Sequence, residues 1–260
     1  MRFLFQPATS IEYRCRAALL FVSQPALAVL CAVALPSDSP WYAPTFGGVA
    51  ALVAATLAIL GTWIRIQAAS YFSSVKVAQP DAIADTIVST GPFGAVRNPL
   101  YLGSLLEFAG YGCSFGWLPA AIYAALHTAR YHRVILREED LFRESWGTAF
   151  TDYCQRVPRW IPDRPWQLLF GCRWTTEAVL GNGPFIGLAA GLVWSGLAGN
   201  LLPVIPCEAA GFLIAALHFL WRSHLAGRSA SEQRTRQTVA RETSTNSTAV
   251  AMTSTRQSAR

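Results

Sequence analysis

Four stretches of roughly twenty mostly apolar residues constrain the fold of this chain more than any other feature. They cover residues 17–35, 46–64, 178–199 and 204–221, and none of them contains Lys or Arg. A bilayer core about 30 Å thick takes roughly 20 apolar residues in helical form. Only 14% of the 260 residues are charged, against roughly 25% in an ordinary soluble domain. The sequence therefore predicts membrane-spanning helices.

A fifth apolar region, residues 100–129, is too long for one span. Gly110, Gly112, Gly116 and Pro119 interrupt it near its middle, and such residues favour turns over continuous helix. We therefore expect a helical hairpin with two short arms. The predicted fold is all-α and polytopic, with about six membrane helices and a cofactor pocket at the cytoplasmic face.

The distribution of basic residues predicts the orientation of the chain. All 21 Lys and Arg residues lie in segments that share one side if the N-terminus is inside, and the segments 36–44, 113–118 and 200–203 contain none. Cytoplasmic loops accumulate Lys and Arg. We expect an integral membrane protein with both termini in the cytoplasm, in a bacterial inner membrane or, in a eukaryote, the endoplasmic reticulum.

Composition divides the chain into four regions. Residues 1–70 form a two-span N-terminal region, 71–175 a core that contains the hairpin and most polar residues, and 176–226 a second two-span region. The segment 227–260 is rich in Ser and Thr and lacks aromatic residues, which is typical of a disordered tail. Polar groups at a membrane boundary are costly unless they have a role, so we expect the functional site in the core.

The net charge of +6 also raises the question of nucleic-acid binding. Arginines dispersed beside apolar spans are better explained by orientation and anionic headgroups, so no nucleic-acid partner is expected. The six cysteines show no metal-site or redox spacing, and no metal is expected. The first apolar run is longer than a usual signal core and lacks a small-residue cleavage site, which favours a retained span.

The first candidate cluster lies at the start of the hairpin. Asn98 suits an N-cap and Pro99 the first helical position, so this segment serves at least to begin a helix. Capping does not explain Arg97, which directly precedes them. A guanidinium beside a helix N-terminus is suited to binding a carboxylate or phosphate.

The second cluster consists of Glu138, Glu139 and Asp140 on the helix that leaves the hairpin. A surface pair between Glu139 and Arg143 is one explanation. Adjacent carboxylates also repel each other, and a bound cation relieves that repulsion. A third group of aromatic residues from Trp146 to Trp160, ending in prolines, is typical of an interfacial helix that packs and then stops.

Taken in order, these clusters resemble the isoprenylcysteine carboxyl methyltransferase family and the related phospholipid methyltransferases. The resemblance covers residues 90–162. In that family an Arg-His-Pro-x-Tyr-x-Gly segment and a downstream Glu pair contribute to the pocket for S-adenosylmethionine. The matching positions are Arg97, Pro99, Tyr101, Gly103, Glu138 and Glu139, and Gly110 with Gly112 is similar to the Gly-x-Gly of the phospholipid enzymes. Asn98 stands where the family usually has His, and Phe150 where it often has Tyr.

The resemblance implies a methyltransferase with S-adenosylmethionine as cofactor. Arg97 would bind the donor's carboxylate, Glu138 and Glu139 its ammonium or ribose, and Tyr101 would line the pocket wall. Gly110 and Gly112 would let the backbone approach the adenosine. Arg97, Asn98 and Tyr101 are the residues expected nearest the reaction.

The substitution of His by Asn98 bears on the methyl acceptor. An acceptor carboxylate is already ionised at neutral pH, whereas an alkylammonium must first lose a proton. We therefore expect carboxyl O-methylation of a lipophilic acceptor that enters from the bilayer. His132 is the histidine best placed to act as a base, although an interfacial structural role explains it more simply.

Two other classes of function are compatible with the sequence. One is an NADPH-dependent sterol-type membrane reductase, for which the Arg-rich stretch 156–173 would bind the additional phosphate. The other is a non-catalytic transporter or scaffold. Transporters usually place polar residues within spans or show repeated halves, whereas these spans carry few polar residues apart from Glu107.

Overall fold

The described residues form helices joined by turns and loops, with no β-strand among them. The computed structural model describes residues 6–34, 48–71, 86–170 and 173–225. The predicted outer loop 36–44 and the predicted disordered tail 227–260 lie outside these residues. The chain divides into two units, Met1–Ala215 and Ala216–Arg260, and of the second unit the structure describes the helical residues 216–225.

The N-terminal helices follow the apolar pattern closely. After the short α1 (Ser10–Arg14), α2 covers Arg16–Ala34 and α3 covers Gly48–Ala69. The first predicted run, 17–35, thus matches α2 within a residue. Helix α3 continues five residues beyond the predicted end of its run and includes Arg65, which the sequence had suggested to lie in a cytoplasmic loop.

The predicted hairpin is present. Helix α6 (Pro99–Cys113) ends at a turn, and α7 (Trp117–Trp146) begins after Gly116, whose φ of 114° suits glycine. The second arm does not stop near residue 129, because α7 continues through the predicted carboxylate cluster as one helix. The polar residues therefore lie on a direct extension of the hairpin.

Shorter helices connect and follow the hairpin. The short α5 (Pro92–Ala95) precedes it, and α8 (Thr148–Arg156) and α9 (Pro165–Phe170) follow it. The predicted run 178–199 is divided into α10 (Thr176–Gly181) and α11 (Gly183–Ala198). The division falls at Asn182, whose side chain bonds the Ala178 carbonyl at 2.8 Å, and Pro184 then suits the start of a new helix.

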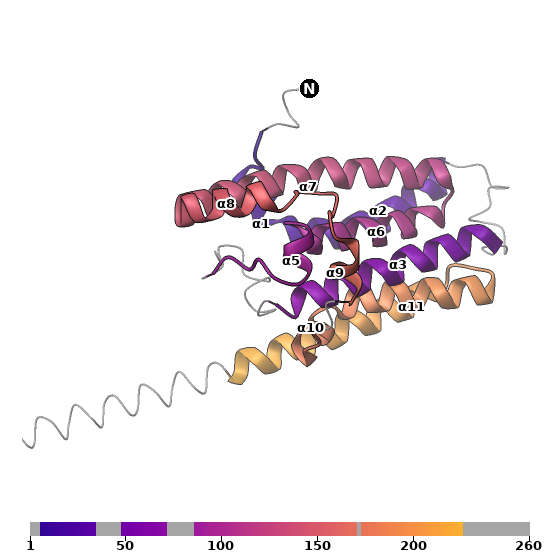
Figure 1. Ribbon diagram of the computed structural model, residues 1–260. Helices are drawn as coiled ribbons and strands as arrows, with labels where there is room; N and C mark the ends of the chain where they lie inside the picture. The colour runs from indigo at the N-terminus through magenta and orange to yellow at the C-terminus, as the bar shows by residue number, and fades with distance from the viewer. Residues whose placement is uncertain (1–5, 35–47, 72–85, 171–172, 226–260) are drawn as a thin grey trace, which may run out of the picture. The chain divides into compact units, whose positions relative to one another are not determined.

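Helix α3 is the central packing element of the first unit, lying between α6 and α11 (Figure 1). Glycines allow the backbones to approach closely. A Cβ on Gly61 would lie 2.4 Å from the Gly103 carbonyl oxygen, and one on Gly187 would lie 2.4 Å from the Cys207 carbonyl oxygen. Small residues at such interfaces are typical of helices that pack within a membrane.

Two helices in the described part of the chain are long and apolar enough to cross a membrane. They are Gly48–Ala69 and Val204–Leu225, and the shorter apolar helices Val22–Cys31 and Gly183–Ala198 accompany them. Several large apolar side chains are exposed, among them Val33, Leu52 and Leu197. Exposed apolar surface of this extent supports contact with lipid. The predicted total of about six spans stays a prediction, because α6, at roughly 22 Å, is shorter than a bilayer core.

A polar interior lies within this helical packing. The Glu107 side chain is fully buried and accepts a hydrogen bond from the Thr62 hydroxyl at 3.0 Å. Arg65 donates to Asn182 Oδ1 and to the Leu100 carbonyl, both at 3.0 Å, and its guanidinium lies 3.5 Å from the centre of the Phe185 ring. These contacts tie α3 to α6 and α11 and give the buried Arg65 its partners, whereas Glu107 Oε2 has no hydrogen-bond partner among the described residues.

Candidate functional site

Glu139 is the centre of the main ion-pair cluster. Its side chain is only 4% exposed and bonds three arginines. Arg159 binds it with two hydrogen bonds of 3.0 and 2.7 Å, Arg97 donates at 2.9 Å, and Arg143 donates at 3.1 Å. Bidentate arginine–carboxylate pairs such as Arg159–Glu139 are among the strongest charge-assisted hydrogen bonds. Glu139 thus gathers residues from α7, from the segment before α6 and from the segment after α8.

Arg97 lies where the chain approaches the hairpin. Its NH1 donates to Glu139 and also to Cys154 Sγ at 3.0 Å, while its backbone N–H donates to the Pro158 carbonyl at 2.9 Å. Its Nε is buried and has no hydrogen-bond partner among the described residues. A buried guanidinium N–H without a partner is costly, and an oxyanion placed beside it would remove that cost.

Glu138 has different surroundings from its neighbour. The Tyr101 hydroxyl donates to it at 2.8 Å, and Arg16 Nε forms a long ion pair with it at 3.9 Å. The carboxyl retains 23% exposure. Burial raises the pKa of Glu138 above its usual value, although hydrogen bonds from Tyr101 and Tyr13 and the charge of Arg16 act in the opposite direction. Since its charge is incompletely compensated, Glu138 is the carboxylate of the pair that is suited to a cation.

Asn98 and Pro99 begin α6 as predicted, but Asn98 does not cap it with its side chain. Pro99 occupies the first turn and is buried, whereas Asn98 Nδ2 donates to the Arg159 carbonyl at 3.2 Å. The amide therefore orients the loop that presents Arg159. An amide has no basic site at neutral pH, so Asn98 does not provide a proton acceptor.

The nearest histidine to this loop is His132. Its Nδ1 accepts from Trp160 Nε1 at 3.4 Å, and the two rings stack. Burial lowers the pKa of His132, and the positive charge of Arg159 lowers it further. His132 is accordingly neutral at pH 7, with Nδ1 engaged by the indole.

The three glycines of the predicted site lie at helix contacts. A Cβ on Gly103 would be 2.6 Å from the Gly61 carbonyl oxygen, and one on Gly110 would be 2.6 Å from the Ala54 carbonyl oxygen. For Gly112 the nearest atom is Ala120 Cα, at 2.7 Å. Close packing against α3 and α7 thus accounts for these glycines, and a contact with the donor's adenosine stays a prediction for Gly110 and Gly112.

The structure therefore brings together Arg97, Asn98, Tyr101, Glu138 and Glu139, while the glycines line the adjoining helix interfaces. Sequence reasoning did not assign Arg159, Cys154, Tyr13 or Arg16 to this cluster. The sequence did contain an indication for Arg159, which is one of few charged residues within an aromatic and proline-rich segment. The sequence contains no such indication for Tyr13 and Arg16, because they come from the N-terminal segment, far from Glu138 in the sequence.

The N-terminal segment around α1 binds to α7 beside the cluster through a hydrogen bond and an ion pair. The Ala8 N–H donates to the Arg133 carbonyl at 2.9 Å, and Glu12 pairs with Arg133 NH2 at 2.8 Å. Thr9 and Glu12 also form a capping box that begins α1. The hydrogen bond from Arg133 is the largest cause of the lowered pKa of Glu12. This arrangement holds Tyr13 against the side of Glu138.

Acidification should loosen this attachment. Because the pKa of Glu12 is lowered from its model-compound value of 4.5, its stabilising effect is present above that pH and is lost as the pH falls through the folded-state value. We expect the hydrogen-exchange protection factor of the Ala8 amide to fall roughly two- to fivefold across this window, as for a part-exposed ion pair. In Glu12→Gln the protection should be reduced at neutral pH and insensitive to acid. Equal protection of the variant and the natural chain at neutral pH would contradict this role.

The fold and the cluster define a helical protein with bilayer-length apolar helices and a carboxylate–guanidinium site at one end of a hairpin. Within it, residues 49–149 match the phospholipid methyltransferase family. The matched region contains α3, α5, α6 and α7, with Arg97, Tyr101, Glu138 and Glu139. It ends before Cys154 and Arg159, and α1 and α2 precede it.

Curated relatives match between about a third and a half of the chain. A cobalt-zinc-cadmium resistance protein, CzcN of Cupriavidus metallidurans, is 30% identical over 128 residues, or 48% of this chain and 53% of the relative. A nickel-cobalt-cadmium resistance protein, NccN of Alcaligenes xylosoxydans xylosoxydans, is 28% identical over 111 residues, or 43% and 47%. The match thus spans about half the length of each of these relatives.

A third relative belongs to another enzyme class. The Delta(14)-sterol reductase TM7SF2 of Mus musculus is 33% identical over 86 residues, which cover 32% of this chain and 21% of the reductase. No solved structure matches the chain. The comparisons thus connect residues 49–149 with a methyltransferase family, and 86 residues of the chain with a reductase.

Proposed function

We propose that the protein is a membrane-embedded methyltransferase that moves a methyl group from S-adenosylmethionine to a lipophilic acceptor. The match of residues 49–149 to the phospholipid methyltransferase family supports the reaction class. The observation that carries the donor site is the contrast between the two adjacent glutamates. Glu139 bonds three arginines at 2.7–3.1 Å, whereas the ion pair between Glu138 and Arg16 is long, at 3.9 Å.

The residues present fit the donor. The unpartnered Nε of Arg97 suits its carboxylate, and Glu138 suits a cationic group, because a cation stabilises the ionised form of a carboxyl whose pKa burial has raised. Three arginines exceed the two carboxylates, Glu139 and Asp140, to which they bond. That excess of positive charge favours an additional carboxylate near Arg97. When bound, the donor supplies a methyl group on a sulfonium.

The protein's part in such a transfer is alignment. Tyr101 fixes Glu138 through its 2.8 Å hydrogen bond, and Glu139 holds Arg97 and Arg159 in place. Positioning of this kind is worth several kcal/mol in a displacement reaction. Asn98 offers no base, and His132 has one ring nitrogen occupied by Trp160. An acceptor that is already ionised, such as a carboxylate, therefore suits these residues best, and we propose carboxyl O-methylation.

Binding of S-adenosylhomocysteine to the purified full chain tests the donor site. We expect it to raise the melting temperature, as any ligand of the folded state does. The Glu138→Gln substitution should weaken its binding by about 10- to 100-fold, the usual effect of losing a hydrogen bond to a charged group. Glu144→Gln, on an exposed part of the same helix, serves as the control and should bind normally. Equal affinity of Glu138→Gln and the control would contradict the assignment.

The acceptor is tested separately. Membranes that contain the protein are incubated with radiolabelled methyl donor, and the lipid extract is treated with base. Release of the label as a volatile product indicates an ester and supports carboxyl methylation. Label that resists base indicates transfer to nitrogen or to another atom.

A sterol-type reductase is the second candidate, because the reductase relative is 33% identical over 86 residues. The two candidates differ in the cofactor that they require. A melting temperature raised by NADPH and unchanged by S-adenosylhomocysteine would favour the reductase over the methyltransferase.

A further inference from the structure

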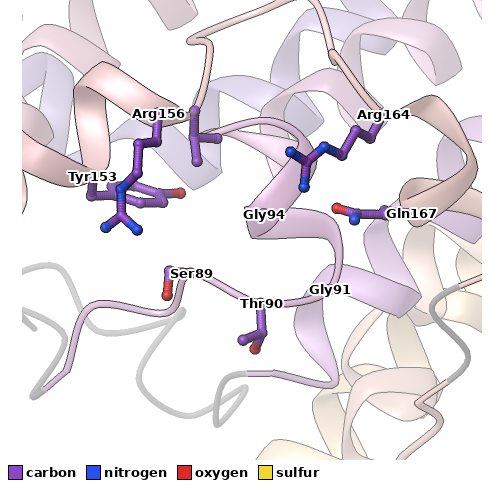
Figure 2. A pocket seen from close by; sticks show the side chains of 9 residues that line it. Ser89, Thr90, Gly91, Gly94, Tyr153, Arg156, Arg164 and Gln167 are labelled. Carbon is purple, nitrogen blue, oxygen red and sulfur yellow. The ribbon is translucent and has the colours of Figure 1, made fainter.

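A cavity of about 430 Å³ lies beside the ion-pair cluster and shares none of its side chains. Its lining comes from α5 and the loop before it, from the end of α8 with the next residue, and from α9 with the residue before it (Figure 2). Cys154 and Arg159 of the cluster and Tyr153, Arg156 and Val157 of the cavity alternate along one segment. That segment therefore forms part of both the cluster and the cavity.

The cavity has two cationic side chains and no carboxylate among its lining residues. Arg156 and Arg164 approach it from two sides, and the amide of Gln167 and the hydroxyls of Ser89 and Thr90 complete its polar surface (Figure 2). Arg156 uses its Nε for the Asp152 carbonyl at 3.2 Å, which leaves both terminal nitrogens as donors. Arg164 has a long 3.9 Å contact with Asp163 through its own Nε.

The loop packs closely against its neighbours through two glycines of the lining. Gly91 has a φ of 58°, and a Cβ there would overlap the Tyr71 ring. A Cβ on Gly94 would lie 3.0 Å from the Ser89 carbonyl oxygen and 3.3 Å from Gln167 Oε1. The Tyr153 hydroxyl donates to the Phe93 carbonyl at 2.8 Å and so fixes α8 against the loop. The walls of the cavity are thus held by contacts that do not use its arginines.

From this arrangement we propose that the cavity is a binding site for a phosphate group. Two guanidinium groups with an amide and hydroxyls around them present donors to a tetrahedral oxyanion from several directions, and arginine matches phosphate geometry with paired N–H donors. The methyl donor does not suit the site, because its sulfonium and ammonium would face two arginines with no carboxylate between them. The site is therefore distinct from the donor site, and its assignment does not depend on the methyl-transfer proposal.

Inorganic phosphate titrated into the detergent-solubilised full chain provides the test, with chloride at equal ionic strength as reference. At a concentration about ten times its dissociation constant, phosphate should raise the melting temperature by about 3–6 °C beyond chloride. The double variant Arg156→Gln, Arg164→Gln should lose this shift. The control Arg14→Gln, which changes an exposed arginine on α1, should retain it.

Two further titrations identify the source of the phosphate group. If a lipid headgroup fills the site, phosphatidylglycerol in the micelles abolishes the phosphate shift, whereas an uncharged detergent at the same concentration does not. If a nucleotide phosphate fills it, NADPH raises the melting temperature more than NADH, and the double variant removes the difference. A phosphate shift no larger than that of chloride, or one that the double variant retains, overturns the proposal.

Discussion

Replacing Glu139 by alanine should destabilise the folded protein by about 3 kcal/mol, the lower end of the range for breaking a buried ion pair. The lower end applies because Arg143 and Arg159, with side chains 45% and 28% exposed, can turn toward water. Arg97 cannot do so easily, since its side chain is only 14% exposed. The remaining cost therefore comes mainly from a buried guanidinium without its carboxylate.

The melting temperature of the purified chain measures this effect, and about 3 kcal/mol corresponds to a decrease of roughly 6–12 °C for a chain of this size. Glu144→Ala is the matched control, because Glu144 lies on the same helix with an exposed side chain. Adding Arg97→Met to Glu139→Ala should recover part of the loss, because it removes the uncompensated charge. A Glu139→Ala variant as stable as the Glu144→Ala control would show that the cluster does not hold these segments together.

Gly110→Leu should destabilise the folded protein about as much as Glu139→Ala, because there is no room for a side chain at this position. The Cβ alone would lie 2.6 Å from the Ala54 carbonyl oxygen and 3.2 Å from the Ala58 nitrogen. Backbone atoms cannot move aside as a side chain can, so α3 and α6 must separate. We expect a loss of about 3 kcal/mol, at the upper end of overpacking effects, although leucine has the better intrinsic helix propensity.

Thermal unfolding and ligand binding together distinguish packing from a donor contact at this glycine. Gly196→Ala is the control, because its Cβ meets only the Ala51 methyl group at 3.2 Å, and its effect should stay within about 1 kcal/mol. If Gly110 serves packing, the milder Gly110→Ala lowers the melting temperature but leaves the affinity for S-adenosylhomocysteine nearly unchanged. A Gly110→Ala variant of normal stability with weakened binding would instead support the approach of the backbone to the donor.

The parts of the fold that local rules govern could be predicted from the sequence. Pro99 begins α6, and Gly116 with its φ of 114° lies in the turn that follows it, because proline and glycine act through their own backbone geometry. The run 17–35 matched α2 because length and hydropathy are properties of consecutive residues. Helix α3 extends beyond its apolar run, because Arg65 is bound by Asn182 and the Leu100 carbonyl, which are distant in the sequence and could not be predicted from it.

The candidate site was predictable only where its residues are close in sequence. Arg97, Asn98 and Tyr101 lie within one segment, and Glu138 and Glu139 are neighbours, so their types and spacing were visible. The sequence gives no indication that Glu139 would bind Arg159 while Glu138 would receive Tyr13 and Arg16 from the N-terminal segment. The different surroundings of two adjacent carboxylates arise from tertiary packing, and they decide which of the two is suited to a cation.

Helix α7 runs without interruption from Trp117 to Trp146. At 1.5 Å per residue its 30 residues form a rod about 45 Å long. One end packs against α6 within the hairpin, and the other carries Glu138 and Glu139. Since the described rod contains no glycine or proline between Ala120 and Trp146 and so no ready hinge, tilting at the hairpin end displaces the carboxylates at the other. A shift of the hairpin end against α6 would therefore reach Glu138 and Glu139 undiminished, although they lie beyond the hairpin.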